Sequence, residues 1–136
     1  MNALYEQLVH AYRREEALYA RVLELVQRQD EVMAAAPDPS CVLELCGDVE
    51  RLMADIAAVE EAVGPAKKRW EETREDPKGE LRAVLTSIEA IIAQVSEVQE
   101  RVQRRLLDHI ERQRQQTESA RASVNASRAR RLYRAG

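Results

Sequence analysis

The chain has 136 residues, of which 45% are hydrophobic, 33% charged and only 4% aromatic. This length fits a single domain, and a composition rich in Ala, Leu, Val, Glu and Arg but poor in Gly and Pro favours long helices over an all-β fold. Because aromatic side chains are scarce, little is available to line a deep ligand pocket, and this argues against an enzyme.

Features of membrane and secreted proteins are missing from the sequence. No run reaches the roughly 18 apolar residues that a membrane-spanning helix needs, and residues 1–12 do not follow the basic-then-apolar order of a signal peptide. Cys41 and Cys46 fit a reducing compartment, and we expect them to be small core residues. The sequence therefore predicts a soluble cytoplasmic protein.

Charge is distributed unevenly along the chain. Residues 1–110 hold 14 Lys and Arg against 22 Asp and Glu, a balance of −8, whereas residues 111–136 hold seven Arg against two Glu, a balance of +5. A basic tail of this kind can contact an acidic partner, RNA or the acidic body of the same protein. It can also simply complement the dipole at the carboxyl end of a helix.

The first helix is predicted over residues 4–33, where the larger residues recur at alternating steps of four and three. A second apolar stripe lies beside the first, so this helix is expected to contact two others. It should end just before Pro37, because proline cannot continue the hydrogen-bond ladder of a helix.

The second helix is predicted to begin at Asp38, whose side-chain oxygen can cap the first turn while the following proline takes the first helical position. Its apolar stripe runs in one register from Val42 to Trp70, past Pro65. We therefore expect a kink at this proline and not a domain boundary.

The third helix is predicted to begin in the same way, with Asp76 as the cap and the next proline as the first helical residue. Its apolar face from Leu81 to Ile110 is the strongest in the chain, and the many β-branched residues indicate a central, buried helix. After Ile110 the pattern fades, but no Gly or Pro interrupts the chain, so the helix can continue to about residue 131.

These elements predict an all-α fold, an elongated antiparallel three-helix bundle or coiled coil with short connections at 37–39 and 76–79. We divide the chain into a helical body over residues 1–110 and a basic helical arm and tail over residues 111–136. Because the third helix is the longest, it should protrude beyond the other two.

No constellation of residues supports catalysis or metal binding. His10 and His109 each lack a second His or Cys at helical spacing, and the Glu-x-x-His pattern of di-metal bundles is absent. Phosphate-binding glycine loops and nucleophile motifs are also absent. Glu15 stands on the apolar stripe, where a single polar residue often fixes register at some cost in stability. We expect no catalytic, cofactor or metal site.

Helix-binding surfaces are the remaining candidates for function. Tyr5, Tyr12 and Tyr19 recur every seven residues and so line one side of the first helix. They are either core residues or the flank of a groove that takes an amphipathic segment of a partner. Trp70 ends the second stripe, either as a cap of the bundle or as a binding hot spot.

The order of these elements resembles a known family. A leucine- and glutamate-rich first helix, a break with proline, a second helix containing Asp-Val-Glu-Arg-Leu at 48–52, and a long third helix ending in residues 125–136 are similar to the FlgN-type flagellar export chaperones. The resemblance implies a cytosolic helical protein that binds hook-associated subunits before type III secretion and prevents their premature assembly. It also implies that residues 102–132 engage a helical segment of this cargo, with the export apparatus as a further partner.

The far part of the third helix is the predicted partner site. Its apolar face outlasts the two helices that cover it, and exposed hydrophobic area on a soluble protein often marks a binding surface. Arginines beside this face would pair with acidic residues of the cargo. The candidate partner-binding residues are Val102, Arg105, Leu106, Ile110, Arg112, Val124, Leu132 and Tyr133.

Two other functions use the same features. A homo-oligomeric coiled-coil protein, such as a rod or secretion-stalk component, would pair its apolar stripes between copies, for instance as a homodimer. An RNA-binding accessory protein would use the basic tail, although Tyr133 is the only aromatic residue there for base stacking.

Overall fold

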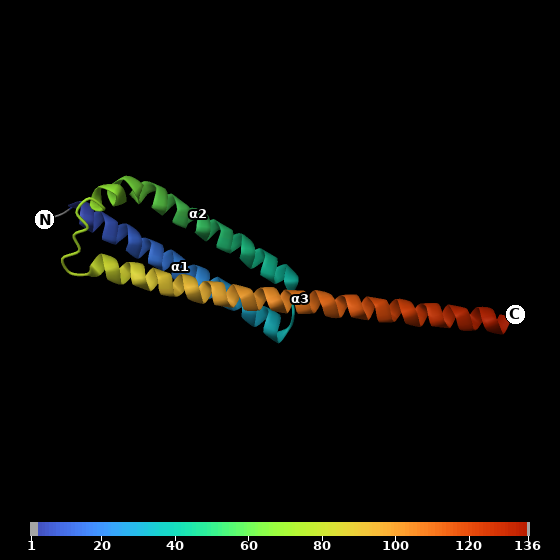
Figure 1. Cartoon of the computed structure of the whole chain (residues 1–136). Helices are drawn as coiled ribbons and strands as arrows, with labels where there is room; N and C mark the ends of the chain where they lie inside the picture. Colours follow the sequence, from blue (N-terminus) through green and yellow to red (C-terminus); the bar gives the residue numbers. More distant parts are fainter. Residues whose placement is uncertain (1–2, 136) are drawn as a thin grey trace.

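The computed structural model describes residues 3–135, which form three helices joined by a short connection at 36–38 and by one at 71–79 that is longer than the predicted 76–79 (Figure 1). α1 spans Ala3–Ala35, α2 spans Pro39–Trp70 and α3 spans Glu80–Ala135. Successive helices run in opposite directions, and the described residues contain no strand. The predicted all-α fold, an elongated antiparallel three-helix bundle with a protruding third helix, is confirmed.

The connection between α1 and α2 follows from its prolines and one capping side chain. α1 ends at Ala35, just before Pro37. The Asp38 carboxylate accepts a hydrogen bond from the backbone N–H of Cys41 at 3.2 Å, and Pro39 is the first residue of α2. This arrangement satisfies one of the free N–H groups of the first turn, and it confirms the predicted cap.

α2 continues as one helix through Pro65 to Trp70. Its ribbon bends near this end (Figure 1), as expected where proline lacks the N–H that would bond to the preceding turn. Val63 and Ala66, on either side of the proline, both lie in the core. The interruption is therefore a kink within one helix, as predicted.

Asp76 fixes the start of α3 from within the preceding loop. Its carboxylate accepts hydrogen bonds from the backbone N–H groups of Leu81 at 3.2 Å and Arg82 at 2.9 Å. The Tyr5 hydroxyl donates a third hydrogen bond to the same carboxylate at 2.5 Å. One side chain thus ties the beginning of α1 to the beginning of α3.

The helix start itself differs from the prediction. Gly79 has a φ of 67°, in the left-handed region that glycine adopts without strain, and its N–H donates to the Asp76 carbonyl at 3.1 Å. This turn must be completed before the helix can begin, so α3 starts at Glu80. Pro77 therefore lies in the loop, and its prediction as the first helical residue is wrong.

α1 is the central helix of the bundle. Both α2 and α3 pack against α1, whereas they make few contacts with each other. The expectation that the first helix contacts two others is confirmed, and the prediction that the third helix is the central one is wrong. Two adjacent apolar stripes on α1 provide a face wide enough to contact two neighbouring helices. The single apolar stripe of α3 packs mainly against α1.

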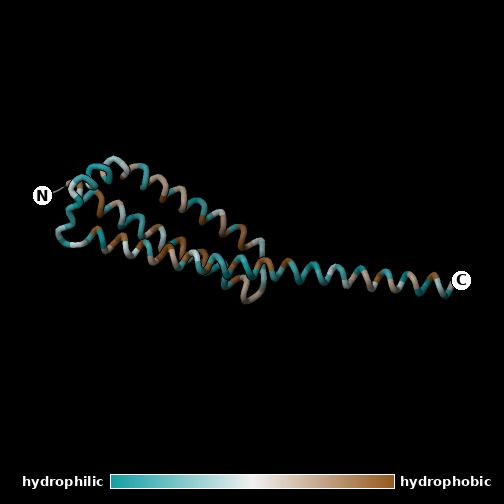
Figure 2. The backbone as a smooth tube through the Cα atoms, viewed as in Figure 1, coloured by the Kyte–Doolittle hydropathy of each residue, from teal (hydrophilic) through white to brown (hydrophobic). Residues whose placement is uncertain are grey.

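Two hydrophobic clusters fill the space between the helices, one near the α2–α3 loop and one near the α1–α2 connection. Figure 2 shows hydrophobic positions gathered where the helices run side by side, while the free part of α3 is mostly hydrophilic. The first cluster contains Tyr5, Leu8, Val9, Tyr12, Val63, Ala66, Leu81, Val84 and Ile88. The second contains Val22, Val26, Met33, Val42, Ile56, Val95, Val98 and Val102.

α3 has 56 residues, compared with 33 in α1 and 32 in α2, and is therefore about 84 Å long. Its second half projects from the bundle (Figure 1). Leu106 is the last side chain of α3 that packs against the core, so we define the arm as residues 107–134. Within the described chain, no helix combines the length and hydropathy needed to cross a membrane.

Candidate functional site

The arm leaves the bundle at a junction held by ion pairs. Asp30 of α1 accepts hydrogen bonds from Arg105 at 2.8 Å and from Arg101 at 3.4 Å, and its side chain is only 19% exposed. Val102 lies between these arginines in the sequence and belongs to the core, and Leu106 is half-buried. The exposed face expected around Val102 and Leu106 is therefore covered, because α1 reaches further along α3 than expected.

Beyond the junction, every described side chain from Ile110 to Arg134 is exposed. Four large apolar residues of the arm fall within a stripe of about 100° around the helix axis, at 100° per residue, and Arg114, Arg121 and Arg128 share this stripe with them. Leu106 lies on the same stripe, which therefore continues the buried face of α3 into solvent. The four residues and their exposures are Leu107 (58%), Ile110 (59%), Val124 (56%) and Leu132 (72%).

The remaining predicted partner-binding residues also belong to the arm or its junction. Arg105 is paired with Asp30, and Arg112 donates to the Asp108 carbonyl at 3.3 Å. Tyr133 is 90% exposed but lies off the apolar stripe. The structure thus leaves five of the eight residues exposed on the arm and places Val102 in the core, with Arg105 and Leu106 at its edge.

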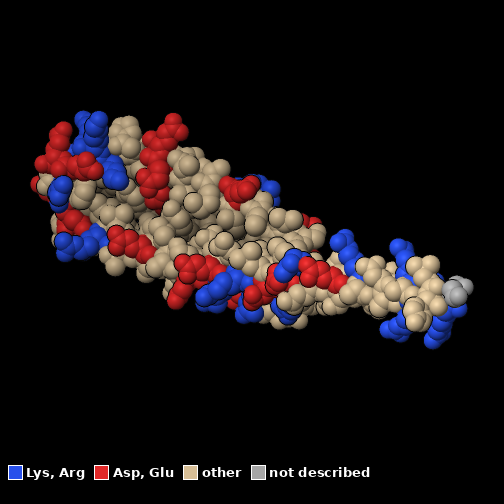
Figure 3. Space-filling view, turned by 45° about the vertical axis from the view of Figure 1, so that its right-hand side comes forward, with Lys and Arg blue, Asp and Glu red and all other residues tan. Residues whose placement is uncertain are grey.

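Charges divide the arm into two halves. In the half nearer the bundle, Arg114 bridges Glu111 at 2.7 Å and Glu118 at 2.9 Å along one side of the helix. After Glu118 the only charged residues are five arginines, at 121, 128, 130, 131 and 134. Figure 3 shows this basic tip, without any acidic side chain on the visible face.

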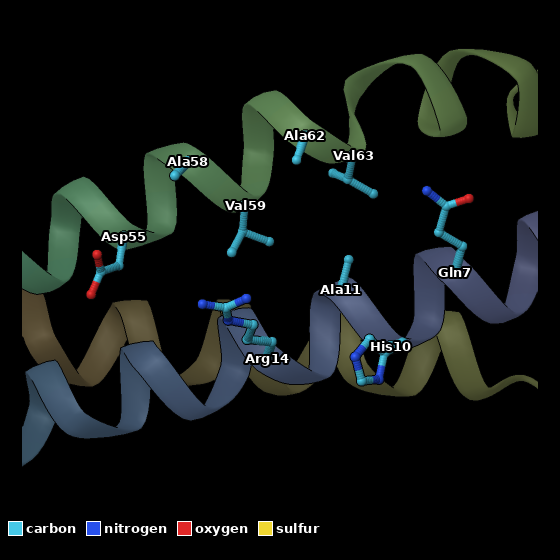
Figure 4. A pocket seen from close by; sticks show the side chains of 9 residues that line it. All are labelled: Gln7, His10, Ala11, Arg14, Asp55, Ala58, Val59, Ala62 and Val63. Atoms are coloured by element: carbon cyan, nitrogen blue, oxygen red, sulfur yellow. The ribbon is translucent and has the colours of Figure 1, made fainter.

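A second apolar surface lies between α1 and α2. A slot of about 280 Å³ opens there, with small side chains of α2 on one wall, among them Ala58 and Ala62 (Figure 4). His10 and Arg14 of α1 and Asp55 of α2 stand at its rim. Sequence reasoning missed this slot, although the alanines at steps of four along α2 are a signal of close helix approach.

A narrower groove of about 240 Å³ lies between α2 and α3 with α1 beneath it. Met53 of α2 and Ile92 of α3 line its edges and are 42% and 39% exposed. This groove exists because α2 and α3 both pack on α1 without closing on each other.

Glu15 is an acidic side chain within the core. It is 2% exposed, and its Oε1 atom has no hydrogen-bond partner. Burial, followed by hydrogen bonding to and repulsion by Glu60, raises the pKa of Glu15 to about 8, while Lys67 opposes this shift. The predicted polar interruption of the apolar stripe therefore exists as a buried carboxyl between α1 and α2.

Gln29 is a second buried polar residue on α1. Its amide nitrogen donates to the Val42 carbonyl at 3.0 Å and to the Cys46 sulfur at 3.2 Å. Cys41 is half-buried and Cys46 exposed, and both are free thiols. Gln29 fixes the position of the first turns of α2 against α1, a role that its place on the heptad stripe alone did not indicate.

The tyrosine stripe belongs to the core. Tyr5 and Tyr12 are buried, Tyr19 packs against both clusters, and burial raises the pKa of Tyr12 to about 12. Trp70 packs on the first cluster, and its Nε1 donates to the Glu75 carbonyl at 2.8 Å. Trp70 therefore caps the bundle and orders the loop that follows it.

The described residues contain no group of His, Cys, Asp and Glu side chains suited to hold a metal ion. No protein-family model, curated protein or solved structure matches the chain. Interpretation of its function therefore depends on the surfaces described above.

Proposed function

We propose that this protein binds an amphipathic helical segment of a partner protein on its arm, and that it acts as a cytosolic export chaperone of the FlgN type for hook-associated flagellar subunits. The observation that supports this proposal is the apolar stripe of the arm, which continues the buried face of α3 beyond the ends of its neighbours. Covering such a stripe with a second helix buries apolar area on both sides.

Charge at the arm favours a partner with acidic residues. Arg112 and the five arginines after Glu118 lie on an exposed helix and are not paired across the bundle. Arginine binds carboxylates through two parallel hydrogen bonds, which adds specificity to apolar contact. A cargo helix with an apolar stripe flanked by Asp and Glu therefore fits the arm.

The proposal can be tested with labelled synthetic peptides that cover the terminal helical segments of hook-associated proteins. Fluorescence anisotropy would measure their affinity for the full chain and for the double variant Leu107→Gln/Ile110→Gln. We expect at least about a tenfold loss of affinity, because two apolar contacts are removed. The matched control is Leu43→Gln, since Leu43 is a 71% exposed leucine on α2, away from the arm.

The slot between α1 and α2 is the alternative binding site for the cargo helix. The variant Ala62→Arg would fill this slot without changing the arm, so it should leave peptide affinity unchanged. If Ala62→Arg abolishes binding while the arm variant does not, the cargo occupies the slot and the arm proposal is wrong. Failure of every hook-associated peptide to bind the full chain would overturn the export-chaperone proposal itself.

A further inference from the structure

The order of charges along the arm identifies a second copy of this chain as its binding partner. We propose that the arms of two molecules pair antiparallel, with Leu107 of each arm beside Leu132 of the other. This pairing requires only the arm and does not depend on the proposed cargo. Three observations support it, and they concern apolar spacing, charge and orientation.

Apolar side chains stand at both ends of the arm on one stripe. Leu107 and Ile110 lie near the bundle and Leu132 lies at the tip, about 38 Å from Leu107 at 1.5 Å per residue. In an antiparallel pair, the tip leucine of each molecule meets the two apolar residues near the bundle of the other. The contact between Leu132 of one chain and Leu107 and Ile110 of the other then occurs twice, related by two-fold symmetry, and it covers both ends of each stripe.

The same register brings opposite charges together. With residue 107 opposite residue 132, the two glutamates that flank the stripe face arginines of the other copy. Glu111 lies level with Arg128 and Glu118 with Arg121, whereas Asp108 points away from the stripe. Each of these pairs occurs twice in a two-fold dimer, so the basic tip of each arm lies against the half that carries all the acidic residues.

Parallel pairing is disfavoured by the same charges. It would place the five arginines after Glu118 against their own copies, with no acidic residue in either tip to separate them. Like charges across a helix interface disfavour the complex and thereby select the other orientation. The charges therefore favour an antiparallel pair of arms in a closed dimer of two chains.

The ion pairs within each arm are compatible with this dimer. Glu111 and Glu118 bind Arg114 of their own helix, but their side chains remain 50% and 61% exposed. Both oxygens of Glu111 already accept hydrogen bonds from Arg114, but each carboxylate oxygen has two lone pairs and can accept a further hydrogen bond from a second arginine. The intrahelical bridges thus hold the acidic side chains in place for a second arginine from the other copy.

Pairing would cover the stripe that the cargo needs. A chaperone molecule without cargo would then be dimeric, and cargo would displace the second arm. This consequence, unlike the pairing, rests on the proposed function. It predicts that cargo peptide lowers the measured mass of the complex toward one chain plus one peptide.

Sedimentation equilibrium of the full chain, without any peptide, tests the pairing. The expected mass rises with concentration from 15.5 kDa toward twice that value, and the dissociation constant increases with salt. The variants Arg121→Glu/Arg128→Glu and Glu111→Arg/Glu118→Arg should each weaken self-association by at least about tenfold, because like charges then meet. Mixing the two variants should restore a dimer within about threefold of the original affinity.

Orientation is tested by disulfide formation in a Cys41→Ser/Cys46→Ser background. Chains carrying Leu107→Cys are mixed with chains carrying Leu132→Cys and oxidised gently. Antiparallel pairing predicts mixed disulfides between positions 107 and 132, whereas disulfides between two copies of position 132 would indicate parallel arms and overturn the proposal. A mass that stays at one chain at every concentration, or mixed variants that fail to associate, would overturn it as well.

Discussion

The two halves of α3 share one helix but differ in what surrounds them. Residues 80–106 bury six valine, leucine and isoleucine side chains against α1 and α2, while every described side chain from Ile110 to Arg134 is exposed. Both halves consist of good helix formers without Gly or Pro. The comparison separates two sources of helical structure, because tertiary packing holds the first half and local interactions alone hold the second.

Local interactions in the arm include the ion pairs of Arg114 with Glu111 and Glu118 and the hydrogen bonds from Arg112 and Thr117 to carbonyl groups one turn earlier. Pairs of this kind contribute only about 0.2–0.5 kcal/mol each in isolated helices. The arm of a single molecule is therefore the least stable part of the structure, and a partner helix that covers its stripe would stabilise it most.

The largest effect is expected from truncation of a core side chain. Leu8→Ala, at a position with no exposure in the centre of the first cluster, should lower the free energy of unfolding by about 3 kcal/mol because it leaves a cavity. Leu132→Ala at the tip of the arm, where the leucine is 72% exposed, should change it by less than about 0.5 kcal/mol. Urea titration followed by circular dichroism measures both, and equal losses would remove the distinction between bundle and arm.

The second-largest effect on stability is expected from titration of the buried Glu15 carboxyl. The pKa of Glu15 is raised above its usual 4.5 to about 8 by burial and by Glu60, so the folded state binds the proton more tightly than the unfolded state does. This contribution to stability is complete below about pH 4.5 and is lost as the pH rises through 8.

Glu15→Gln isolates this titration, because the amide replaces the protonated acid at nearly constant shape. Thermal melts of both proteins from pH 5 to pH 9 should give similar melting temperatures at pH 5 and a higher one for the variant at pH 9. A difference that is the same at every pH would show that the carboxyl does not titrate in this window.

A smaller loss of stability is expected from a change at the junction between the bundle and the arm. Asp30→Asn removes the ion pairs with Arg101 and Arg105, which should cost about 0.5–1 kcal/mol because the carboxylate is mostly buried while the arginines are partly solvated. Hydrogen exchange of residues 98–110 should accelerate, while the exchange near Leu8 stays unchanged. Arg51→Gln is the control, since Arg51 pairs with Asp48 on the exposed side of α2.

The smallest effect on the bundle is expected from removal of the arm beyond Ile110. The core clusters contain only residues up to Val102, so a chain ending at residue 110 should melt within about 3 °C of the full chain at low concentration. Calorimetry of both chains measures the difference. A much larger drop would mean that the arm stabilises the bundle, contrary to its exposure.

The end of α1 and the start of α2 were predictable from the sequence because Pro37 and Asp38 act within a few residues of their own positions, whereas the start of α3 was not. Register was also predictable, since the stripes from Val42 to Trp70 and from Leu81 onward decide which face is buried. The same local reasoning placed Glu15 on the buried face.

Arrangement of the helices could not be predicted in the same way. A stripe shows which face of a helix is covered but not how many neighbours share it, so the stripes alone do not show that α1, and not α3, is the central helix. Coverage of Val102 depends on how far α1 extends along α3, which the turn at Gly79 and the hydrogen bond from Tyr5 to Asp76 determine. The slot beside Ala62 depends in the same way on how α1 and α2, which are distant in sequence there, pack against each other.

The central position of α1 also divides the bundle into two seams that can open independently. Because α2 and α3 make few contacts with each other, separation of α2 from α1 leaves the packing of α3 on α1 in place. The Tyr5–Asp76 hydrogen bond secures the α3 seam at one end and the Asp30 ion pairs secure it at the other. Gln29 holds the first turns of α2 to α1, so we expect the opposite end of α2 to separate first, which moves Glu60 away from the buried Glu15 and admits water to it.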